Sequence, residues 1–265
     1  MARNVAVFGG TGFIGEYAVR ELKRRGETCV VIDAATPRDV VSNAIADATH
    51  IMWLIPPIPK LLKSLAMEIS AAPHLEKFFY ASTMLLYGDS DVPQKEDAPL
   101  RPCTDYERAK YAEERIVRGM FAKHPEGFVV ARFANVYGDV KNRGVIGKIF
   151  SALRDGSTFL VNGDGSQRRD HVHVADAARL ATDLLFTRAA HGVYNVSTGA
   201  AHSLRELIGE IERVAGKKTK ITWSDSIEEK YMIVADPAKL KKLLKRVAMR
   251  SLNEGLEETH KRYAR

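Results

Sequence analysis

The chain has 265 residues, of which 45% are hydrophobic and 28% charged, the balance of a globular protein that can bury a sizeable core. This composition excludes disordered, collagen-like and coiled-coil chains, and no apolar run approaches the roughly 20 residues of a membrane-spanning helix. With only two cysteines, Cys29 and Cys103, and a first strand that begins almost at once, we expect no disulfide framework, no signal peptide and a cytoplasmic location.

Most of the net charge of +7 lies in residues 216–265, where 13 basic side chains stand against 7 acidic ones. A basic segment can bind nucleic acid. Here, however, Leu240, Leu243, Leu244 and Val247 follow the i, i+3, i+4, i+7 spacing of an amphipathic helix, so the intervening lysines are expected on its solvated face. No aromatic interleaving or DNA-binding motif accompanies them. We therefore predict no nucleic-acid partner and no membrane partner.

Strands and helices alternate over the first half of the chain. Apolar runs predict strands at 3–8, 28–33, 49–55, 76–81 and 127–133, and helical patterns separate them at 13–25, 37–47, 59–71 and 103–123. This alternation is typical of βαβ units that build a parallel sheet. From about residue 139 glycine-containing loops interrupt it, and a capping box at 203–206 opens a helix that runs through Val214. The predicted fold class is α/β: a doubly wound parallel sheet with a small C-terminal substrate subdomain.

A glycine-rich turn joins the first strand to the first helix. It places bare backbone N–H groups at a helix N-terminus, which forms an anion site suited to a pyrophosphate. Asp33 ends the second strand, 18 residues past Gly15, where a carboxylate can hold the adenosine ribose hydroxyls. Asp33 would repel a 2′-phosphate, which favours NAD as the cofactor, whereas the nearby Arg38 leaves NADP possible. The predicted cofactor contacts in this region are Gly9, Thr11, Gly12, Phe13, Ile14, Gly15 and Asp33.

Tyr106 and Lys110 are four residues apart on a predicted helix and therefore share a face. A phenol titrates at about pH 10. The Lys110 cation, together with an oxidised nicotinamide, would favour the phenolate and make Tyr106 an acid or base near neutrality. Lys110 can also bind the nicotinamide ribose, so it is a predicted cofactor contact as well. The spacing alone is weak, because surface pairs on helices share it.

Two hydroxyl residues, Ser82 and Thr83, strengthen this interpretation. They follow the strand predicted at 76–81, at the carboxyl edge where doubly wound sheets bind ligands. Thr83 could bond the substrate oxygen that Tyr106 protonates. We therefore predict Thr83, Tyr106 and Lys110 as the catalytic residues, and we interpret Ser82 as a satisfied structural hydroxyl.

Histidines His171 and His173 alternate with valines along a short predicted strand. No acid or cysteine stands at metal-ligand spacing from them. We interpret them as strand or pocket-wall residues and predict no metal site.

Together these motifs resemble those of the NAD-dependent epimerase/dehydratase family of nucleotide-sugar enzymes, which are extended short-chain dehydrogenase/reductases. The segments that carry the resemblance stand in family order: GGTGFIG at 9–15, AST and YG within 81–88, YERAK at 106–110, ARFANVYG at 131–138, GDGSQRRDHVHVAD at 163–176 and GVYNVSTG at 192–199. The resemblance implies a Rossmann domain with bound NAD, and Thr83, Tyr106 and Lys110 as the catalytic set. It further implies that Asn135 and Arg169 approach a substrate diphosphate, and that the chain forms homodimers through helices that include the one bearing Tyr106.

The same resemblance implies a division of the chain into two parts. A cofactor-binding domain would comprise residues 1–140 and about 168–196. A substrate subdomain would comprise about 141–167 and 197–265. By this comparison the chain is a shortened member. The stretch between Asp33 and the strand at 49–55 is too short for a further strand plus a helix, so we expect one edge strand of the sheet to be absent.

Several substrate-side positions depart from the family pattern. Met84 and Leu85 stand where the sugar 4,6-dehydratases carry an Asp-Glu acid pair, which argues against dehydration. Asn162 replaces an expected aromatic ring, and Ser226 falls near an expected second phosphate-binding arginine. Both changes favour a smaller or unusual substrate over a nucleotide-diphosphate sugar.

Two enzymatic functions follow from these observations. The family favours an epimerase of UDP- or dTDP-sugars, whereas the reduced nucleotide site favours a ketoreductase acting on a keto-sugar or another secondary-metabolite ketone. In either enzyme Tyr106 would exchange a proton with the substrate oxygen, Thr83 would polarise that oxygen, and hydride would pass between carbon and nicotinamide. A non-catalytic dinucleotide-binding sensor is a third interpretation, and the intact trio argues against it.

Overall fold

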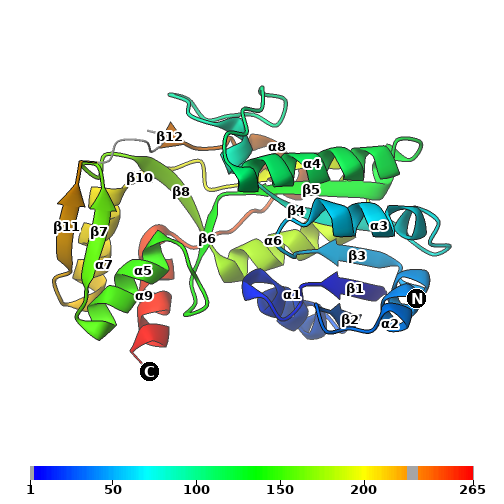
Figure 1. Cartoon of the computed structure of the whole chain (residues 1–265), viewed down its shortest axis with the longest axis horizontal. Helices are drawn as coiled ribbons and strands as arrows, with labels where there is room; N and C mark the ends of the chain where they lie inside the picture. Colours follow the sequence, from blue (N-terminus) through cyan, green and yellow to red (C-terminus); the bar gives the residue numbers. More distant parts are fainter. Residues whose placement is uncertain (1–2, 226–231, 265) are drawn as a thin grey trace.

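Six parallel strands form the central sheet in the order β2-β1-β3-β4-β5-β9 (Figure 1). The computed structural model describes residues 3–225 and 232–264. The six strands are β1 (Asn4–Phe8), β2 (Thr28–Ile32), β3 (His50–Trp53), β4 (Lys77–Thr83), β5 (Phe128–Phe133) and β9 (Gly192–Val196). All five pairings between neighbours are parallel, as the alternation of strands and helices predicts.

Helices cover both faces of this sheet. Successive β1 residues point to opposite sides, so Val5 and Val7 pack in one core cluster while Ala6 and Phe8 pack in the other. The first cluster lies under α1 (Phe13–Arg24) and α6 (Val174–Phe186). The second lies under α2 (Arg38–Asp47), α3 (Pro59–Ser70) and α4 (Asp105–Met120). The doubly wound α/β architecture is confirmed.

In the part of the chain that the structure describes, the six-stranded sheet ends at β2, without the further edge strand whose absence the sequence predicts. Only α2 connects β2 to β3, and within the described residues no strand lies beyond β2 on that side. This confirms the expectation drawn from the short stretch after Asp33. Because the absent strand belongs to an edge, the other five strands remain buried, whereas β2 becomes the edge and leaves Val30 and Val31 partly exposed.

A smaller lobe lies beside the carboxyl ends of the large sheet (Figure 1). Its strands are β6 (Asn135–Tyr137), β8 (Arg168–His173), β10 (Ala201–Ser203) and β12 (Met232–Ile233), with the parallel pair β7 (Thr158–Asn162) and β11 (Lys220–Ser224). Its helices are α5 (Val145–Asp155), α7 (Leu204–Ala215) and α9 (Leu252–Tyr263). These helices enclose a third core cluster that includes Tyr137, Phe150 and Leu256. The predicted capping box opens α7, because the Glu206 N–H donates to Ser203 Oγ at 3.1 Å.

Three short helices complete the described structure: η1 (Met84–Tyr87), η2 (Pro125–Gly127) and α8 (Ala238–Leu244). The sequence spacing predicts one amphipathic helix from Leu240 through Val247, and this is wrong in extent. The helix stops at Leu244, and the next residue, Lys245, has a left-handed backbone with φ 54°. Val247 packs against the main core although it lies beyond the end of the helix. The i, i+3, i+4, i+7 spacing therefore identified residues that pack on the core but not the length of the helix. Across the described residues, no helix has the length and apolarity to cross a membrane.

Candidate cofactor and substrate site

The turn between β1 and α1 has the backbone that its glycines predict. Gly9 has φ 82°, a conformation that side chains disfavour, and the Gly12 N–H donates to the Gly9 carbonyl at 3.0 Å. A Cβ at Gly15 would lie 2.0 Å from that same carbonyl oxygen, so only glycine fits there. Gly12 caps α1 with no side-chain bond, which leaves the first N–H groups of the helix available to an anion.

Beside this turn lies a cavity of about 510 Å³ between the end of β2 and the segment after β3. Asp33 lines it, and its carboxylate accepts the Ala35 N–H at 3.0 Å, which fixes the tip of the β2–α2 loop. Arg38 lines it as well, but its guanidinium is held by Glu68 at 2.5 Å and by Ser42 at 2.6 Å. The glycine turn and the carboxylate therefore border one cavity, and these residues fit a dinucleotide. The engaged Arg38 fits a 2′-phosphate less well.

Lys110 is tied to the carboxyl end of β4. A capping box of Thr104 and Glu107 opens α4 just ahead of Tyr106 and sets the phase of the helix. Lys110 lies on the buried face of α4, which also carries Glu113 and Val117. It is 4% exposed, and its Nζ donates to the Ala81 carbonyl at 2.7 Å. Burial lowers the pKa of Lys110 to about 8, which leaves the ammonium form predominant at neutral pH.

Tyr106 stands one turn earlier on the same helix and is 46% exposed. Loss of water around its phenol and, secondly, the negative charge of Glu113 hold the pKa of Tyr106 above its ordinary value. The sequence reasoning expected Lys110 and an oxidised nicotinamide together to lower this pKa. Burial and Glu113 act in the opposite direction, and the Lys110 Nζ bonds to the main chain, so a lowered pKa in the presence of the cofactor stays a prediction.

Thr83 ends β4 and is 7% exposed. Its Oγ1 accepts the Leu85 N–H at 3.2 Å and caps η1, and its hydroxyl hydrogen can still be donated. Helix α4 packs against both β4 and η1, so the structure brings Thr83 to the same strand end as Lys110 and the helix turn of Tyr106. The three predicted catalytic residues thus border one region of the molecule.

A buried polar network, missed by the sequence reasoning, lies behind these residues. Arg132, 2% exposed, donates to Glu114 from Nε at 3.0 Å and from Nη2 at 2.8 Å. Ser82 donates to Glu114 at 2.6 Å, which confirms its interpretation as a structural hydroxyl. The Tyr87 hydroxyl accepts from Arg132 at 2.9 Å and donates to Asn195 at 2.6 Å. The available signal was the position of Glu114, four residues after Lys110 on the same helix face.

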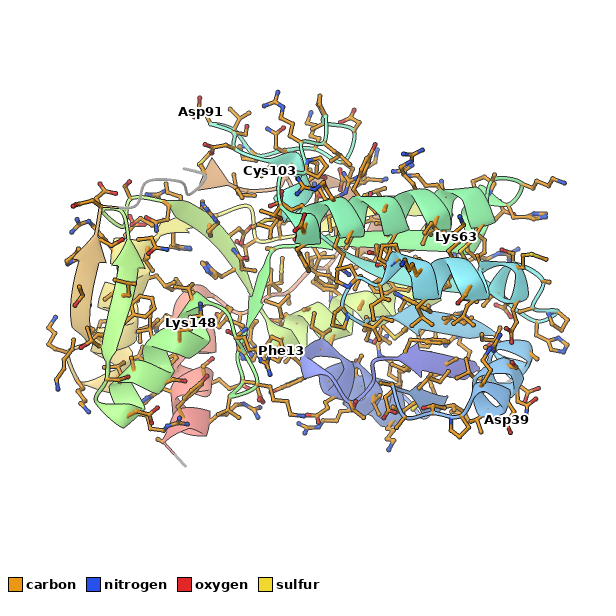
Figure 2. All side chains as sticks on the ribbon, viewed as in Figure 1. Phe13, Asp39, Lys63, Asp91, Cys103 and Lys148 are labelled. Carbon is orange, nitrogen blue, oxygen red and sulfur yellow. The ribbon has the colours of Figure 1, made fainter. Side chains whose placement is uncertain are left out.

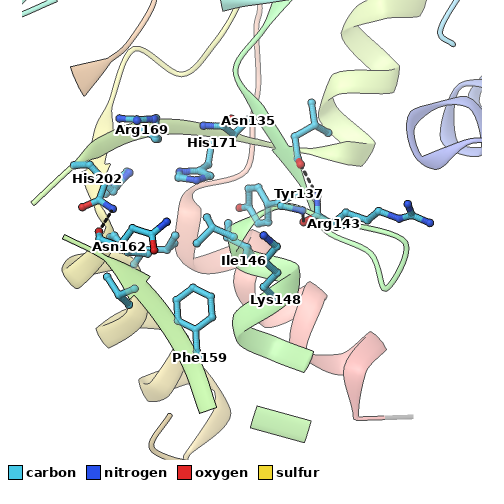
Figure 3. A pocket seen from close by; sticks show the side chains of 18 of the residues that line it. Asn135, Tyr137, Arg143, Ile146, Lys148, Phe159, Asn162, Arg169, His171 and His202 are labelled. Carbon is cyan, nitrogen blue, oxygen red and sulfur yellow. Dashed lines mark hydrogen bonds between the residues drawn. The ribbon is translucent and has the colours of Figure 1, made fainter. Parts of the chain in front are cut away.

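A second cavity, also of about 510 Å³, opens on one face of the small sheet (Figure 3). Strand register explains its polar wall. Asn135 stands opposite His171 between β6 and β8, and His202 stands opposite Arg169 between β10 and β8. Residues two apart on a strand share a face, so Arg169 and His171 lie on the same side of β8. Their strand neighbours His202 and Asn135 line the same cavity. The structure therefore brings the predicted pair Asn135 and Arg169 into one pocket.

The charged side chains that line this second cavity are all positive. Its described lining includes the cations Arg143, Lys148 and Arg169 and no aspartate or glutamate. Phe159 and Leu160 add an apolar wall, next to the Asn162 that replaces an expected aromatic ring. Such a surface suits an anionic ligand that also carries a flat apolar group. Ser226 lies outside the described residues.

His171 is a residue of β8 that lines this pocket, as its interpretation as a strand or pocket-wall residue predicts. It is 7% exposed, and within the described part of the chain neither ring nitrogen has a hydrogen-bond partner. Burial lowers its pKa to about 3, so the ring is neutral and offers one donor and one acceptor. His173 differs, because its Nδ1 accepts the Ala175 N–H at 3.3 Å and caps α6.

Consecutive residues at the N-terminus of α1 line the two cavities. Gly12 lines the first cavity, and the next residue, Phe13, lines the second. Figure 2 places Phe13 at the end of α1 that faces the smaller lobe. A dinucleotide in the first cavity and an anionic substrate in the second would therefore meet near this residue.

A family model and related proteins of known name both resemble this chain. The model of the "NAD dependent epimerase/dehydratase family" matches residues 60–197. A dTDP-D-glucose 4,6-dehydratase of Mus musculus is 29% identical over 162 residues, which are 59% of this chain and 46% of that protein. A putative UDP-glucose 4-epimerase of Methanocaldococcus jannaschii is 26% identical over 67% of this chain and 60% of its own. The chain thus spans about half the length of these relatives.

Solved structures share the fold over nearly the whole chain. The UDP-glucose 4-epimerase of Thermus thermophilus, solved in complex with NAD, superposes with a TM-score of 0.83 at 23% identity. That superposition covers 98% of this chain and 99% of the other. The overall fold is therefore shared over almost the whole length of both chains.

Proposed function

Because the chain belongs to the NAD-dependent epimerase/dehydratase family, we propose that it is an NAD-dependent epimerase of a UDP- or dTDP-sugar. The observation that carries this proposal is the pair of cavities lined by consecutive residues, Gly12 and Phe13, at the N-terminus of α1. One has a glycine turn and a strand-end carboxylate, and the other has three cations and no described acid. A dinucleotide fits the first and a nucleoside diphosphate fits the second.

The proposed roles combine the two cavities with the family pattern at the end of β4, since Thr83, Tyr106 and Lys110 are not among the residues that line either cavity. The α1 N-terminus and Asp33 would hold NAD, which supplies hydride acceptance and return when bound. Tyr106 would move a proton to and from the sugar hydroxyl, Thr83 would donate to the same oxygen, and Lys110 would hold the nicotinamide ribose. Met84 and Leu85 carry no acidic group, so neither offers the acid that dehydration requires. Both side chains pack in or against the main core cluster instead.

The test is to release any bound nucleotide from the purified protein by denaturation and to assay the native protein with UDP-glucose and dTDP-glucose. We expect near-stoichiometric NAD and interconversion of the 4-epimers without net NADH. An empty protein that consumes added NADH on keto-sugars would replace the epimerase by the ketoreductase. Absence of any dinucleotide binding would reject both.

Asp33 provides a prediction on cofactor choice. Replacing it by alanine should weaken NAD binding about 10-fold, because a charge-assisted bond to the ribose hydroxyls is worth about 1.5 kcal/mol. NADP binding should weaken less or improve, since the repelling charge is gone. Fluorescence titration with NADH and NADPH measures both. Equal losses for the two cofactors would contradict the assignment.

Arg169 provides a prediction on the substrate. Arg169→Met should weaken binding of UDP at least 10-fold, because a charge-assisted contact to phosphate contributes about 1.5–3 kcal/mol. NADH affinity should stay unchanged. Calorimetric titration with UDP is the measurement, and Arg24→Met, an exposed residue of α1 paired with Glu21, is the control. Unchanged UDP affinity in Arg169→Met would remove this residue from the substrate site.

We further propose a homodimer formed through α3 and α4. These helices border an open groove lined mostly by small and apolar residues, together with Lys63 and Arg115, and Met67 in this groove is 86% exposed. A second copy packed on this groove would cover that surface. Light scattering should give twice the chain mass, and Ala112→Glu should halve it by placing a charge in the groove. A monomeric wild-type protein would contradict the proposal.

A further inference from the structure

Glu113 is a buried carboxylate for which the proposed reaction has no direct use. It has no exposed surface and lies on α4, three residues after Lys110 and seven after Tyr106. These spacings place all three side chains along one helix face. A buried carboxylate without a salt-bridge partner is unfavourable unless donors satisfy it, so its contacts identify what it does.

Both oxygens of Glu113 accept from donors. Oε1 accepts the Ile58 N–H at 2.7 Å, and Oε2 accepts the Tyr80 hydroxyl at 2.6 Å. Two donors bind the ionised form of a carboxylate rather than the acid. Burial raises the pKa of Glu113, whereas these bonds and the Lys110 charge oppose that rise.

The bond to Ile58 reaches the cofactor cavity. Ile58 stands between Pro57 and Pro59, and Pro56 precedes them, so residues 56–59 contain a single backbone N–H. Glu113 binds that N–H. The same segment lines the first cavity through Ile55, Pro56 and Ile58. Glu113 therefore connects the wall of the cofactor cavity to the helix of Tyr106 and Lys110.

The bond to Tyr80 reaches Lys110. The Lys110 Nζ lies 4.8 Å from the centre of the Tyr80 ring, whose hydroxyl donates to Glu113. The charged or titratable groups around this carboxylate are Lys110 and Tyr106 on α4, Tyr80 on β4, and Glu114, which Arg132 pairs from β5. Both Glu113 and Glu114 favour the Lys110 cation, Glu113 more strongly, and Glu114 is already paired with Arg132.

We propose that Glu113 is a positioning residue of this site: it anchors the 54–58 wall of the cofactor cavity to α4, and its charge keeps Lys110 protonated beneath Tyr106. The inference rests on the proposed function for its effect on turnover. It is specific to an acid at this position, because both contacts need an acceptor and the effect on Lys110 needs a charge.

The charge is tested with Glu113→Gln. Its amide oxygen can accept from Ile58, and the Tyr80 hydroxyl can rotate to accept from its NH₂, so the contacts remain while the charge is lost. Loss of the charge lowers the pKa of Lys110 and that of Tyr106. Both limbs of the pH profile of kcat/KM should therefore move to lower pH, by about one unit for a charge several ångströms away.

Tyr80→Phe is the matched control, because it removes one bond but keeps the charge. We expect its pH profile to stay within about 0.3 unit of the wild type, in the range of a neutral change. A Glu113→Gln profile that superimposes on the wild type would overturn the charge role. A purely structural residue would lower the rate without moving either limb.

The anchor is tested by hydrogen exchange with mass spectrometry on the peptide containing Ile58. Glu113→Leu removes the acceptor and should speed exchange of this amide at least 10-fold and weaken NADH binding several-fold, whereas Glu113→Gln should do neither. Unchanged exchange and affinity in Glu113→Leu would overturn the anchor role. These readouts need no sugar substrate. If no sugar is turned over, the proposed function fails while the anchor is still tested, and the pH dependence of NADH affinity replaces the kinetic profile.

Discussion

Replacing Tyr106 by phenylalanine should lower kcat by about 10²–10⁴-fold, the usual contribution of a positioned acid or base. The change removes only the phenolic oxygen, and the ring keeps its place one turn before Lys110. NADH affinity should therefore change by less than about threefold, because Lys110 and the glycine turn are intact. Steady-state kinetics with the accepted sugar nucleotide and a fluorescence titration with NADH give the two numbers.

Tyr111→Phe is the matched control for this prediction. Tyr111 lies on the same helix and is 36% exposed, close to the 46% of Tyr106, but it does not share the face of Lys110. It should retain activity within about twofold, as surface changes away from a site do. Full activity in Tyr106→Phe would transfer the proton role to another group. Equal losses in both variants would indicate a general effect on α4.

Local chemistry explains why much of the cofactor side could be predicted. Gly9 is favoured by its positive φ and Gly15 is required by its contact with the Gly9 carbonyl, and the i, i+4 spacing of Tyr106 and Lys110 is a property of one helix. Asp33 follows its strand directly. Such features depend on neighbours in the chain, so the residue pattern carries them without knowledge of the tertiary fold.

The substrate side depends on long-range pairing, which a single sequence does not contain. His171 could be placed on a strand, but its polar surroundings arise from registers that join β8 to β6 and β10. Neither register has a local signal. The bond between Glu113 and Ile58 likewise joins residues 55 positions apart. Predicting it would require the packing of α3 on α4.

Arg132 shows what the hydrophobic pattern leaves unspecified. It stands within the apolar run at 127–133, which predicts a buried strand, and β5 is indeed buried throughout. A charged residue inside such a run needs a partner, and the partner came from α4 rather than from a neighbouring position. Periodicity identified the strand but gave no indication of which residue neutralises the charge.

The largest stability effect is expected from this buried pair. Arg132→Met should reduce the free energy of unfolding by about 3–5 kcal/mol, because it leaves Glu114 with a buried negative charge. Glu114 is 1% exposed and would keep the Ser82 hydroxyl as its donor, which cannot neutralise the charge. Urea denaturation at pH 7, followed by circular dichroism, measures the loss.

A second variant separates the uncompensated charge from lost packing. In Arg132→Met/Glu114→Gln both charges are gone, so most of the lost stability should return, since replacing a buried pair by neutral groups is often tolerated. Arg24→Met, which breaks the exposed pair with Glu21, should cost less than about 1 kcal/mol. If the double variant is no more stable than Arg132→Met, the loss comes from the arginine bonds to Tyr87 and the Glu96 carbonyl rather than from Glu114. The network behind the catalytic strand would then be held by hydrogen bonding more than by charge.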